Sequence, residues 1–202
     1  MELDNTDAGE MRTRILNAAE ILLRRHGPEK LTVVDVARAL NMSHGNVYRH
    51  IPSKAALRAA VIERWLDRVA EQTDAIARKD GPADIRLGAW LRGLAIVKQR
   101  KVTDDAELLA ASAKVVRDAP QVEQEHSARL TSQVAQILQD GLDDGTLPCV
   151  RDPQSTATAI LNATFRYHHP DLVANGGPPD LQLAALDEVI SLITSGLKRT
   201  KT

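Results

Sequence analysis

The side chains best suited to chemistry lie in one short polar run, Ser43 to His50. Arginine can pair with guanine and asparagine with adenine, whereas hydroxyl and ammonium groups can hold phosphates. A merely solvated helix more often carries Glu and Lys, so this polar, basic and aromatic set indicates a nucleic-acid interface. Its members are Ser43, His44, Gly45, Asn46, Tyr48, Arg49 and His50.

Two short helices joined by a tight turn, within residues 32–51, are expected to position these side chains. Thr32 can cap a helix over TVVDVARAL, and Ser43 can cap a shorter helix that runs to His50. Asn41 tolerates the left-handed backbone that the turn between them requires. The pattern predicts a helix-turn-helix, whose second helix enters the DNA major groove. A plain pair of packed helices remains the alternative.

Three strings carry a family resemblance: AAEILLRRHG, then TVVDVA, then MSHGNVYRHIPSKAAL. Together they resemble the DNA-binding domain of the tetracycline-repressor (TetR) family of bacterial transcription regulators, over residues 10–60 without a gap. The string VYRHxPSKxxL is highly specific to that family. Two positions depart from the family pattern, Asn41 in place of Gly and Ile51 in place of Phe. Asn accepts a positive φ and Ile keeps the core contact, so both departures are compatible with the fold.

The resemblance implies a role for each matching position. Phosphate contacts would come from Thr32, Tyr48 and Lys54. The side chains nearest the base edges would be His44, Asn46 and Arg49. Gly45 would let the helix backbone approach the DNA. For Tyr48 the alternative is a half-buried aromatic side chain between helices.

Charge is distributed unevenly along the chain. Residues 10–68 carry eleven Lys and Arg against six Asp and Glu, whereas residues 1–9 and residues 69–202 each have a net charge of −3. A basic first third on an acidic remainder suggests a polyanion-binding unit joined to a larger body with another purpose.

Composition excludes several classes of protein. A single cysteine among 202 residues rules out a disulfide framework and a multi-cysteine zinc site. The acidic N-terminus lacks the apolar core of a signal peptide, and no apolar run approaches the roughly 18 residues that a membrane span needs. We therefore expect a soluble, cytoplasmic protein without a membrane partner.

Helical spacing recurs along the chain and strand-like alternation does not, which predicts an all-α fold of about nine helices. We expect residues 1–9 to form a disordered tail, residues 10–55 the helix-turn-helix domain, and residues 56–202 a helical domain for ligand binding and dimerisation. The first helix should end at His26-Gly27-Pro28, and the helix that follows Asp152 should run to about His169.

A small-molecule pocket is expected in the second domain, walled mainly by aliphatic side chains because large rings are scarce. Such a cavity suits an apolar or amphipathic molecule. Helical spacing gives the candidates Trp90, Leu94, Leu109, His126, Leu130, Phe165 and His168. The same side chains could instead fill the core. For His126, His168 and His169 a role in contacting a ligand or metal stays open beside the commoner buried, hydrogen-bonded histidine.

No catalytic signature is present: the chain has no HExxH, no GxSxG, no Gly-rich phosphate loop and no paired-carboxylate pattern. Cys149 has no histidine nearby in the sequence, so an inert thiol is expected. We predict neither enzyme activity nor a metal or cofactor.

A two-fold dimer is expected because a recognition helix this short contacts few base pairs alone. The last two long helices are the predicted seam and would build a four-helix bundle across the axis. The interface candidates are Ile160, Ala163, Leu186, Ile190, Ile193 and Leu197.

These features predict a DNA-binding transcriptional regulator: a homodimeric repressor that leaves double-stranded operator DNA when an unidentified small molecule binds the second domain. The fourth helix, from Lys54 to Ile76, would carry the signal as the only continuous connector between the domains. Two alternatives stay open, an all-helical protein-interaction module and a small-molecule carrier or enzyme that binds no operator.

Overall fold

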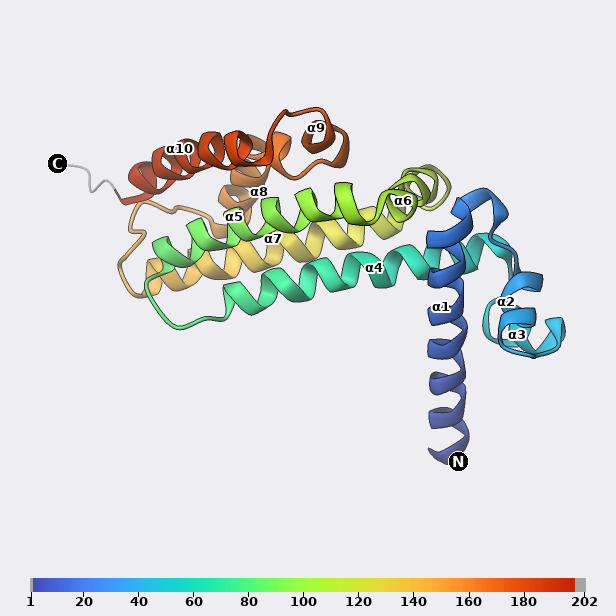
Figure 1. Cartoon of the computed structure of the whole chain (residues 1–202). Helices are drawn as coiled ribbons and strands as arrows, with labels where there is room; N and C mark the ends of the chain where they lie inside the picture. The colour runs from blue at the N-terminus through green and yellow to red at the C-terminus, as the bar shows by residue number, and fades with distance from the viewer. Residues whose placement is uncertain (1, 199–202) are drawn as a thin grey trace. The chain divides into compact units, whose positions relative to one another are not determined.

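The structure, a computed structural model, describes the backbone of residues 2–198 and the side chains in that range except those of residues 2–8, 28–30 and 116. Over this range it contains ten α-helices, one 3₁₀ helix and no strand, which confirms the all-α prediction (Figure 1). The elements are α1 (Glu2–Lys30), α2 (Val33–Ala39), α3 (His44–His50), α4 (Lys54–Ala77), α5 (Ala83–Asp104), α6 (Ala106–Asp118), α7 (Pro120–Asp143), α8 (Pro153–Ala163), η1 (Phe165–Tyr167), α9 (Pro170–Ala174) and α10 (Pro179–Lys198).

The helices form two compact units, each with its own core. The N-terminal unit comprises Met1–Leu66 and Asp105–Gln124, and the C-terminal unit comprises Asp67–Asp104 and Glu125–Thr202. The chain passes from one to the other three times: within α4, between α5 and α6, and within α7. The prediction that the fourth helix is the only continuous connector is therefore wrong.

The position of α6 differs from the predicted division at residue 55. This helix packs against α1 in the N-terminal unit, although the sequence division assigns it to the second domain. The physical reason is its apolar face, since Leu108, Ala111 and Val115 are buried in the N-terminal core.

α1 begins earlier than expected. Residues 2–9, predicted as a disordered tail, are helical. No proline interrupts this segment, and extending an existing helix costs far less than nucleating a new one. At the other end Gly27 has a φ of 75°, which breaks the helical geometry where the stop at His26-Gly27-Pro28 is predicted.

α2 and α3 form the predicted hairpin, and side-chain caps fix where each helix begins. Thr32 Oγ1 accepts a hydrogen bond from the Asp35 backbone N–H (3.1 Å), and Ser43 Oγ accepts one from the Asn46 backbone N–H (3.2 Å). Asn41 between the helices has a φ of 53°, the left-handed value that the turn requires. Both helices pack against α1 (Figure 1).

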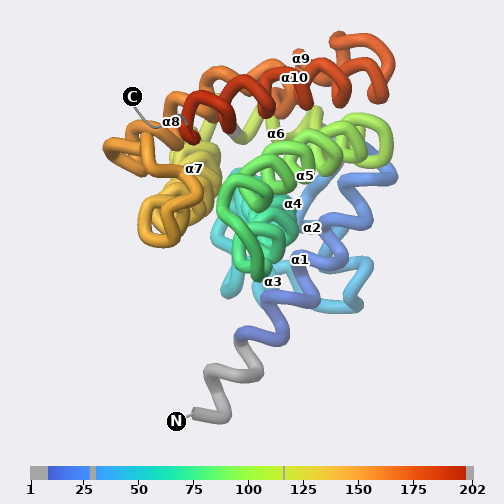
Figure 2. The backbone as a smooth tube through the Cα atoms, turned by 90° about the vertical axis from the view of Figure 1, so that its left-hand side faces the viewer, coloured from blue at the N-terminus to red at the C-terminus, as the bar shows by residue number. Residues whose placement is uncertain are grey.

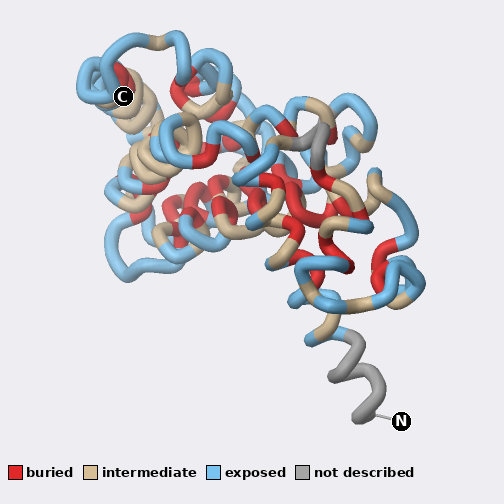
Figure 3. The backbone as a smooth tube through the Cα atoms, turned by 45° about the vertical axis from the view of Figure 1, so that its right-hand side comes forward, coloured by how far each residue is buried: buried red, intermediate tan, exposed pale blue. Residues whose placement is uncertain are grey.

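The N-terminal core supports this hairpin from behind. Its buried side chains include Ile15, Leu23, Val36, Val47, Leu57 and Leu108. Buried stretches of the backbone are drawn in red in Figure 3. Each buried side chain of this size stabilises the fold by about 1.5–3 kcal/mol. The exposed side of α3 is therefore carried on a packed scaffold.

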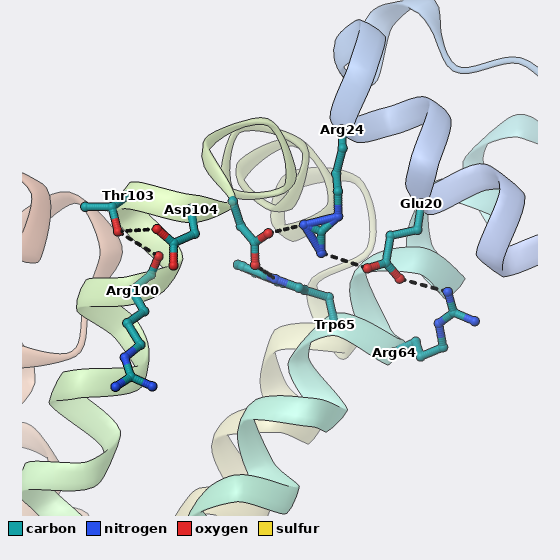
Figure 4. Close-up of polar contacts among 8 residues, drawn as sticks. Glu20, Arg24, Arg64, Trp65, Arg100, Thr103 and Asp104 are labelled. Atoms are coloured by element: carbon teal, nitrogen blue, oxygen red, sulfur yellow. Dashed lines mark hydrogen bonds and ion pairs between the residues drawn. The ribbon is translucent and has the colours of Figure 1, made fainter.

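A buried carboxylate joins three segments of the N-terminal unit. Asp105, just before α6, is 7% exposed and accepts a hydrogen bond from the Trp65 indole Nε1 (3.0 Å). Its second oxygen pairs with Arg24 of α1. Arg24 also contacts Glu20 (2.8 Å), which in turn pairs with Arg64 of α4 (2.8 Å), as Figure 4 shows. This network links α1, α4 and the start of α6.

The C-terminal unit packs the second half of α4 with α5, α7, α8 and α10. α10 lies along α5 (Figure 1, Figure 2). In its core the Trp90 indole and the Thr73 hydroxyl both donate to Gln133 Oε1, at 2.9 and 2.7 Å. Gln133 Nε2 donates to the Ala70 carbonyl (2.9 Å), so this half-buried amide bridges α4, α5 and α7.

α8 is shorter than predicted, because it ends at Ala163 and not near His169. The Thr164 hydroxyl donates back to the Ile160 carbonyl (2.9 Å), a local bond that competes with further helix. Pro170 then opens α9 at the first helical position, which proline favours. This short helix is the one that the sequence pattern does not reveal.

Replacement of Asp105 by Ala tests the network. We expect Asp105→Ala to lower the free energy of unfolding by about 1–3 kcal/mol, because the buried indole N–H of Trp65 loses its acceptor. Urea unfolding followed by Trp fluorescence measures the effect. The matched control is Asp104→Ala at the exposed neighbour, which should change stability little. Equal stability of the two variants would contradict this role.

Candidate functional site

α3 presents a largely exposed polar surface. The exposed residues are Ser43, His44, Gly45, Tyr48 and Arg49; Asn46 and His50 are half-buried, and Val47 is buried. Tyr48 is 49% exposed, so its ring is not enclosed between helices. The buried Val47 fixes the helix on the core and leaves the remaining positions accessible to a large ligand.

The two capping hydroxyls are not equivalent. Thr32 Oγ1 accepts from the Asp35 N–H and donates to the Asp35 carboxylate, so both of its capacities are used within α2. Ser43 Oγ accepts a hydrogen bond from the Asn46 N–H, and its hydroxyl proton stays available for an outside acceptor. A phosphate contact is therefore simpler for Ser43 than for Thr32.

Gly45 has open space around it. A methyl group at this position would meet no atom within 4 Å. Since alanine is the better helix former, the fold itself gives no reason for glycine inside α3. Glycine at this position would, however, allow an external molecule to approach the backbone closely.

Lys54 is the first residue of α4 and is half-buried. Ser53 caps the same helix, with its Oγ accepting from the Ala56 N–H (3.0 Å). The N-terminal end of a helix attracts anions because its first N–H groups point outward. An ammonium group at this end adds a full positive charge, which suits a phosphate.

The seven predicted pocket residues do not lie in one place. Leu109 belongs to the core of the N-terminal unit, so it is not part of a pocket in the C-terminal one. Trp90, Leu94 and Leu130 are packed in the C-terminal core. Phe165 is 46% exposed, next to the imidazole rings of His168 and His169. Helical spacing predicts which apolar side chains face the protein interior, but not which of the two cores they pack in.

His126 and His168 are both held as neutral rings. His126 is 2% exposed, and its Nε2 lies 3.4 Å from Lys98 Nζ. Burial, followed by the positive charges of Lys98, Arg129 and His168, lowers the pKa of His126 to about 3. Burial lowers the pKa of His168 to about 4, although the Leu161 carbonyl, 3.1 Å from its Nε2, opposes the shift.

An open cleft of about 610 Å³ lies elsewhere in the C-terminal unit, around the end of α4 and the start of α5. Four of its charged groups form two ion pairs, Arg78 with Asp74 (2.5 Å) and Arg86 with Asp140 (2.9 Å). The lining residues are Asp74, Ala77, Arg78, Lys79, Asp80, Gly81, Arg86, Ser132, Gln133, Gln136 and Asp140. None of the predicted pocket residues is among them.

Two residues of the predicted dimer seam need correction. Leu186 and Ile160 are buried within the C-terminal unit, so they are core residues. Half-buried members of the same stripe also pack on this core, namely Ile190, Ile193 and Leu197. The reason is that α10 turns its regular apolar stripe toward α5. Ala163 is exposed as expected.

The accessible apolar side chains of α10 are Leu181 and Leu192, at 63% and 75% exposure. They lie on another side of the helix from the regular stripe. α8 adds exposed small residues, Ala159 and Ala163. Sequence periodicity missed this second surface because isolated leucines form no run.

Among the described residues, no group of three or more His, Cys, Asp or Glu side chains could hold a metal ion. Among the same residues, no helix is both long enough and apolar enough to cross a membrane.

The histidine environment predicts a specific pH dependence. Unfolded His126 has a pKa near ~6.5, so below that pH the unfolded chain binds a proton that the folded chain excludes. Acidification from pH 7 to 4.5 should therefore remove about 2–3 kcal/mol of stability through this residue alone. His126→Phe should lose that part of the slope in urea unfolding, while His26→Gln, at an exposed histidine, should retain it. A His126→Phe chain with the full parental slope would contradict the assignment.

Comparison with known sequences identifies both parts of the chain. The sequence model of bacterial regulatory proteins of the tetR family matches residues 15–61, and that of the tetracyclin repressor-like C-terminal domain matches residues 83–190, just over half of the chain. The HTH-type transcriptional regulator UidR of Escherichia coli (strain K12) is 27% identical over 169 residues, which cover 81% of this chain and 83% of that protein.

Solved structures share the fold. A TetR-family transcriptional regulator from Pectobacterium atrosepticum has a TM-score of 0.70 at 19% identity, with 98% of each chain covered. Thermus thermophilus FadR, a TetR-family transcriptional repressor in complex with lauroyl-CoA, has a TM-score of 0.64 at 18% identity, covering 95% of this chain and 97% of that one. With both family models matched and the helix-turn-helix in place, the chain belongs to the tetracycline-repressor family and is a DNA-binding transcriptional regulator.

Proposed function

We propose that the chain is a cytoplasmic, homodimeric repressor that binds double-stranded operator DNA through α3 and leaves it when a small molecule binds the C-terminal unit. The observation that carries this proposal is the surface of α3. It is exposed, basic and aromatic, and a fully packed core holds it from behind.

The chemistry of α3 favours the major groove of DNA over a protein partner. Arg49 can make a bidentate contact with guanine, and Asn46 with adenine. Ser43 and Tyr48 offer hydroxyl groups to phosphates at the edges of the same helix. A protein-interaction helix would instead present an apolar stripe, but the apolar residue of α3, Val47, is buried.

Dimerisation is proposed because α3 has seven residues and can contact only a few base pairs. Two copies held about one helical turn of DNA apart, or slightly more, would double the site. The accessible surface of α8 and α10 supports such a contact. Leu181 and Leu192 supply apolar area, and Ala159 and Ala163 allow close approach of a second backbone.

Ligand response is proposed to act through the segments shared by both units. α4 runs without interruption from Lys54, beside the recognition helix in sequence, to Ala77 in the C-terminal unit. A rigid helix transmits tilt and does not absorb it. The complex of Thermus thermophilus FadR with lauroyl-CoA supports the idea that this fold accepts a small molecule. The effector would have to favour the released state by several kcal/mol.

The competing functions make different predictions about DNA. A protein-interaction module or a carrier would show no affinity for DNA that falls with salt, whereas phosphate contacts make affinity salt-dependent. The relatives reported above are named regulators or repressors, so they give no support to the enzyme or carrier alternative.

Base readout is tested with DNA from the region upstream of the chain's own coding sequence. Arg49→Ala and Asn46→Ala should each lose about 1–3 kcal/mol of discrimination at one base position. Lys54→Ala should weaken binding to all sequences alike and lower the salt slope by about one charge. Fluorescence anisotropy over a series of single-base variants and salt concentrations separates the two effects. Unchanged sequence preference in Arg49→Ala would contradict the assignment.

Gly45→Ala separates DNA contact from folding. The methyl group fits the free protein and should stabilise α3 by about 0.5–1 kcal/mol. On DNA the same methyl group meets the duplex, and binding should weaken by about 1–3 kcal/mol, the value of one good base contact. Thermal unfolding and anisotropy measure the two effects on one sample. A variant that gains stability and binds DNA as well as the parent would exclude close backbone approach.

Leu192→Asp tests the dimer surface. The side chain is exposed, so the fold should tolerate the charge, but a partner subunit would have to bury it. We expect light scattering to give a dimer for the parent and a monomer for Leu192→Asp at micromolar concentration, with weakened operator binding. Ile85→Asp, at an apolar residue of α5 with 65% exposure, is the matched control and should remain dimeric. A dimeric Leu192→Asp chain would show that the seam lies elsewhere.

A further inference from the structure

Three basic side chains meet in the C-terminal unit, from elements distant in sequence. Lys98 lies on α5, His126 on α7, and His168 follows η1. Lys98 Nζ is 3.4 Å from His126 Nε2, and the positive charge of Lys98 acts on both imidazole rings. We call these residues the basic cluster.

One hydrogen-bond donor of the cluster, on His126, has no acceptor. An ammonium group can only donate, so His126 Nε2 must accept from Lys98 and the proton of the neutral ring lies on Nδ1. That Nδ1 is buried and has no hydrogen-bond partner. His168 uses Nε2–H on the Leu161 carbonyl. A sealed N–H without an acceptor is rare in folded proteins and calls for a specific explanation.

The electrostatics of the cluster have one sign. The charged and titratable groups that act on His126 are Lys98 of α5, Arg129 of its own helix, and His168. Arg129 is ion-paired with Asp67. His168 is affected in turn by Lys98 and by His169, again as positive groups. An oxygen acceptor that carries negative charge would satisfy the orphan donor and this field together.

Apolar surface adjoins the cluster. The Phe165 ring stands edge-on to His168, with 5.7 Å between ring centroids, and is 46% exposed. One helical turn from Lys98 and from His126 lie Leu94 and Leu130, both in the C-terminal core. Because Leu94 and Leu130 are packed in the core, the exposed Phe165 ring is the apolar group that the apolar part of a ligand can contact.

We propose that the basic cluster binds the carboxylate of a small organic acid, with His126 Nδ1–H as the donor, the positive charge of Lys98 on the Nε2 side of the same ring, and Phe165 against the apolar part. This assignment rests on the proposed function, since it names the chemical class of the effector for which the C-terminal unit is responsible. It concerns ligand binding alone and holds for the protein without DNA.

The test uses the full chain, free of DNA, and a probe series of straight-chain acids from acetate to decanoate together with benzoate. Neutral octanamide and benzamide have the same apolar bodies, and inorganic phosphate represents the other common anion. Isothermal calorimetry gives affinity, and NMR of the ¹⁵N-labelled imidazole rings reports on His126. We expect saturable binding of one or more acids, a shift of the His126 Nδ1 signal, and an affinity at least about tenfold above that of the matching amide.

Variants make the result specific. His126→Phe and Lys98→Met should each weaken acid binding at least about tenfold, and His126→Phe should not lower the melting temperature of the ligand-free chain, because an unpaired donor is removed. Lys79→Met, in the polar cleft, is the matched control and should bind as the parent does. Four results would each overturn the proposal. They are full acid affinity in His126→Phe, equal affinity for an acid and its amide, binding of phosphate alone, and no binding by any member of the series.

Operator binding is scored separately by adding DNA afterwards. A parent chain that binds the acids but binds no DNA even without ligand leaves the carboxylate site intact and refutes the regulator. Acid binding absent in a chain that still binds its operator refutes the carboxylate site alone.

Discussion

The buried carboxylate of Asp105 is the interaction on which the N-terminal unit depends. Charge in a low-dielectric interior is tolerated only when it is paired, and Asp105 is paired on both oxygens, with the Trp65 indole and with Arg24. Because Trp65 lies on α4 and Arg24 on α1, this one side chain fixes where α6 must begin. The recognition helix is in turn supported by α1 and the core that these contacts align.

This pairing also explains the division of the chain into units. α5 ends at Asp104 in the C-terminal unit, and the next residue already belongs to the N-terminal one. A displacement of the end of α5 would therefore act directly on Asp105, and through it on α1 and α4. In the proposed function, the α5–α6 junction would offer an effector signal a second route beside α4.

The DNA-binding hairpin could be predicted from the sequence because its determinants are local. Thr32 and Ser43 cap their own helices, and Asn41 supplies the left-handed turn. Gly27 breaks the helical geometry of α1 within the predicted stop sequence His26-Gly27-Pro28. Nothing local indicates that α6 joins this unit, because the partners of Asp105 are distant in sequence: Trp65 by 40 residues and Arg24 by 81. Periodicity predicts the apolar stripe of α10 but not the element against which it packs. Leu186 is therefore predicted at the dimer interface, whereas it is buried in the core of the chain.

The same limit applies to the C-terminal site. His126 and His168 are candidates from the sequence, but their proximity to Lys98 depends on tertiary packing and could not be predicted. Sites at which local rules fail, such as a buried donor without an acceptor, are where function is expected at the expense of stability. The scaffold around them follows ordinary packing rules.

A nuclease footprint on the DNA flanking the chain's own coding sequence tests the central claim most directly. The account predicts two protected half-sites related by two-fold symmetry, with centres about one helical turn apart or slightly more, and protection that fades as salt is raised. Protection should also disappear when Arg49 and Asn46 are both replaced by Ala. A chain that protects no DNA at low salt, or that protects all sequences equally, would contradict the assignment of α3 as a recognition helix.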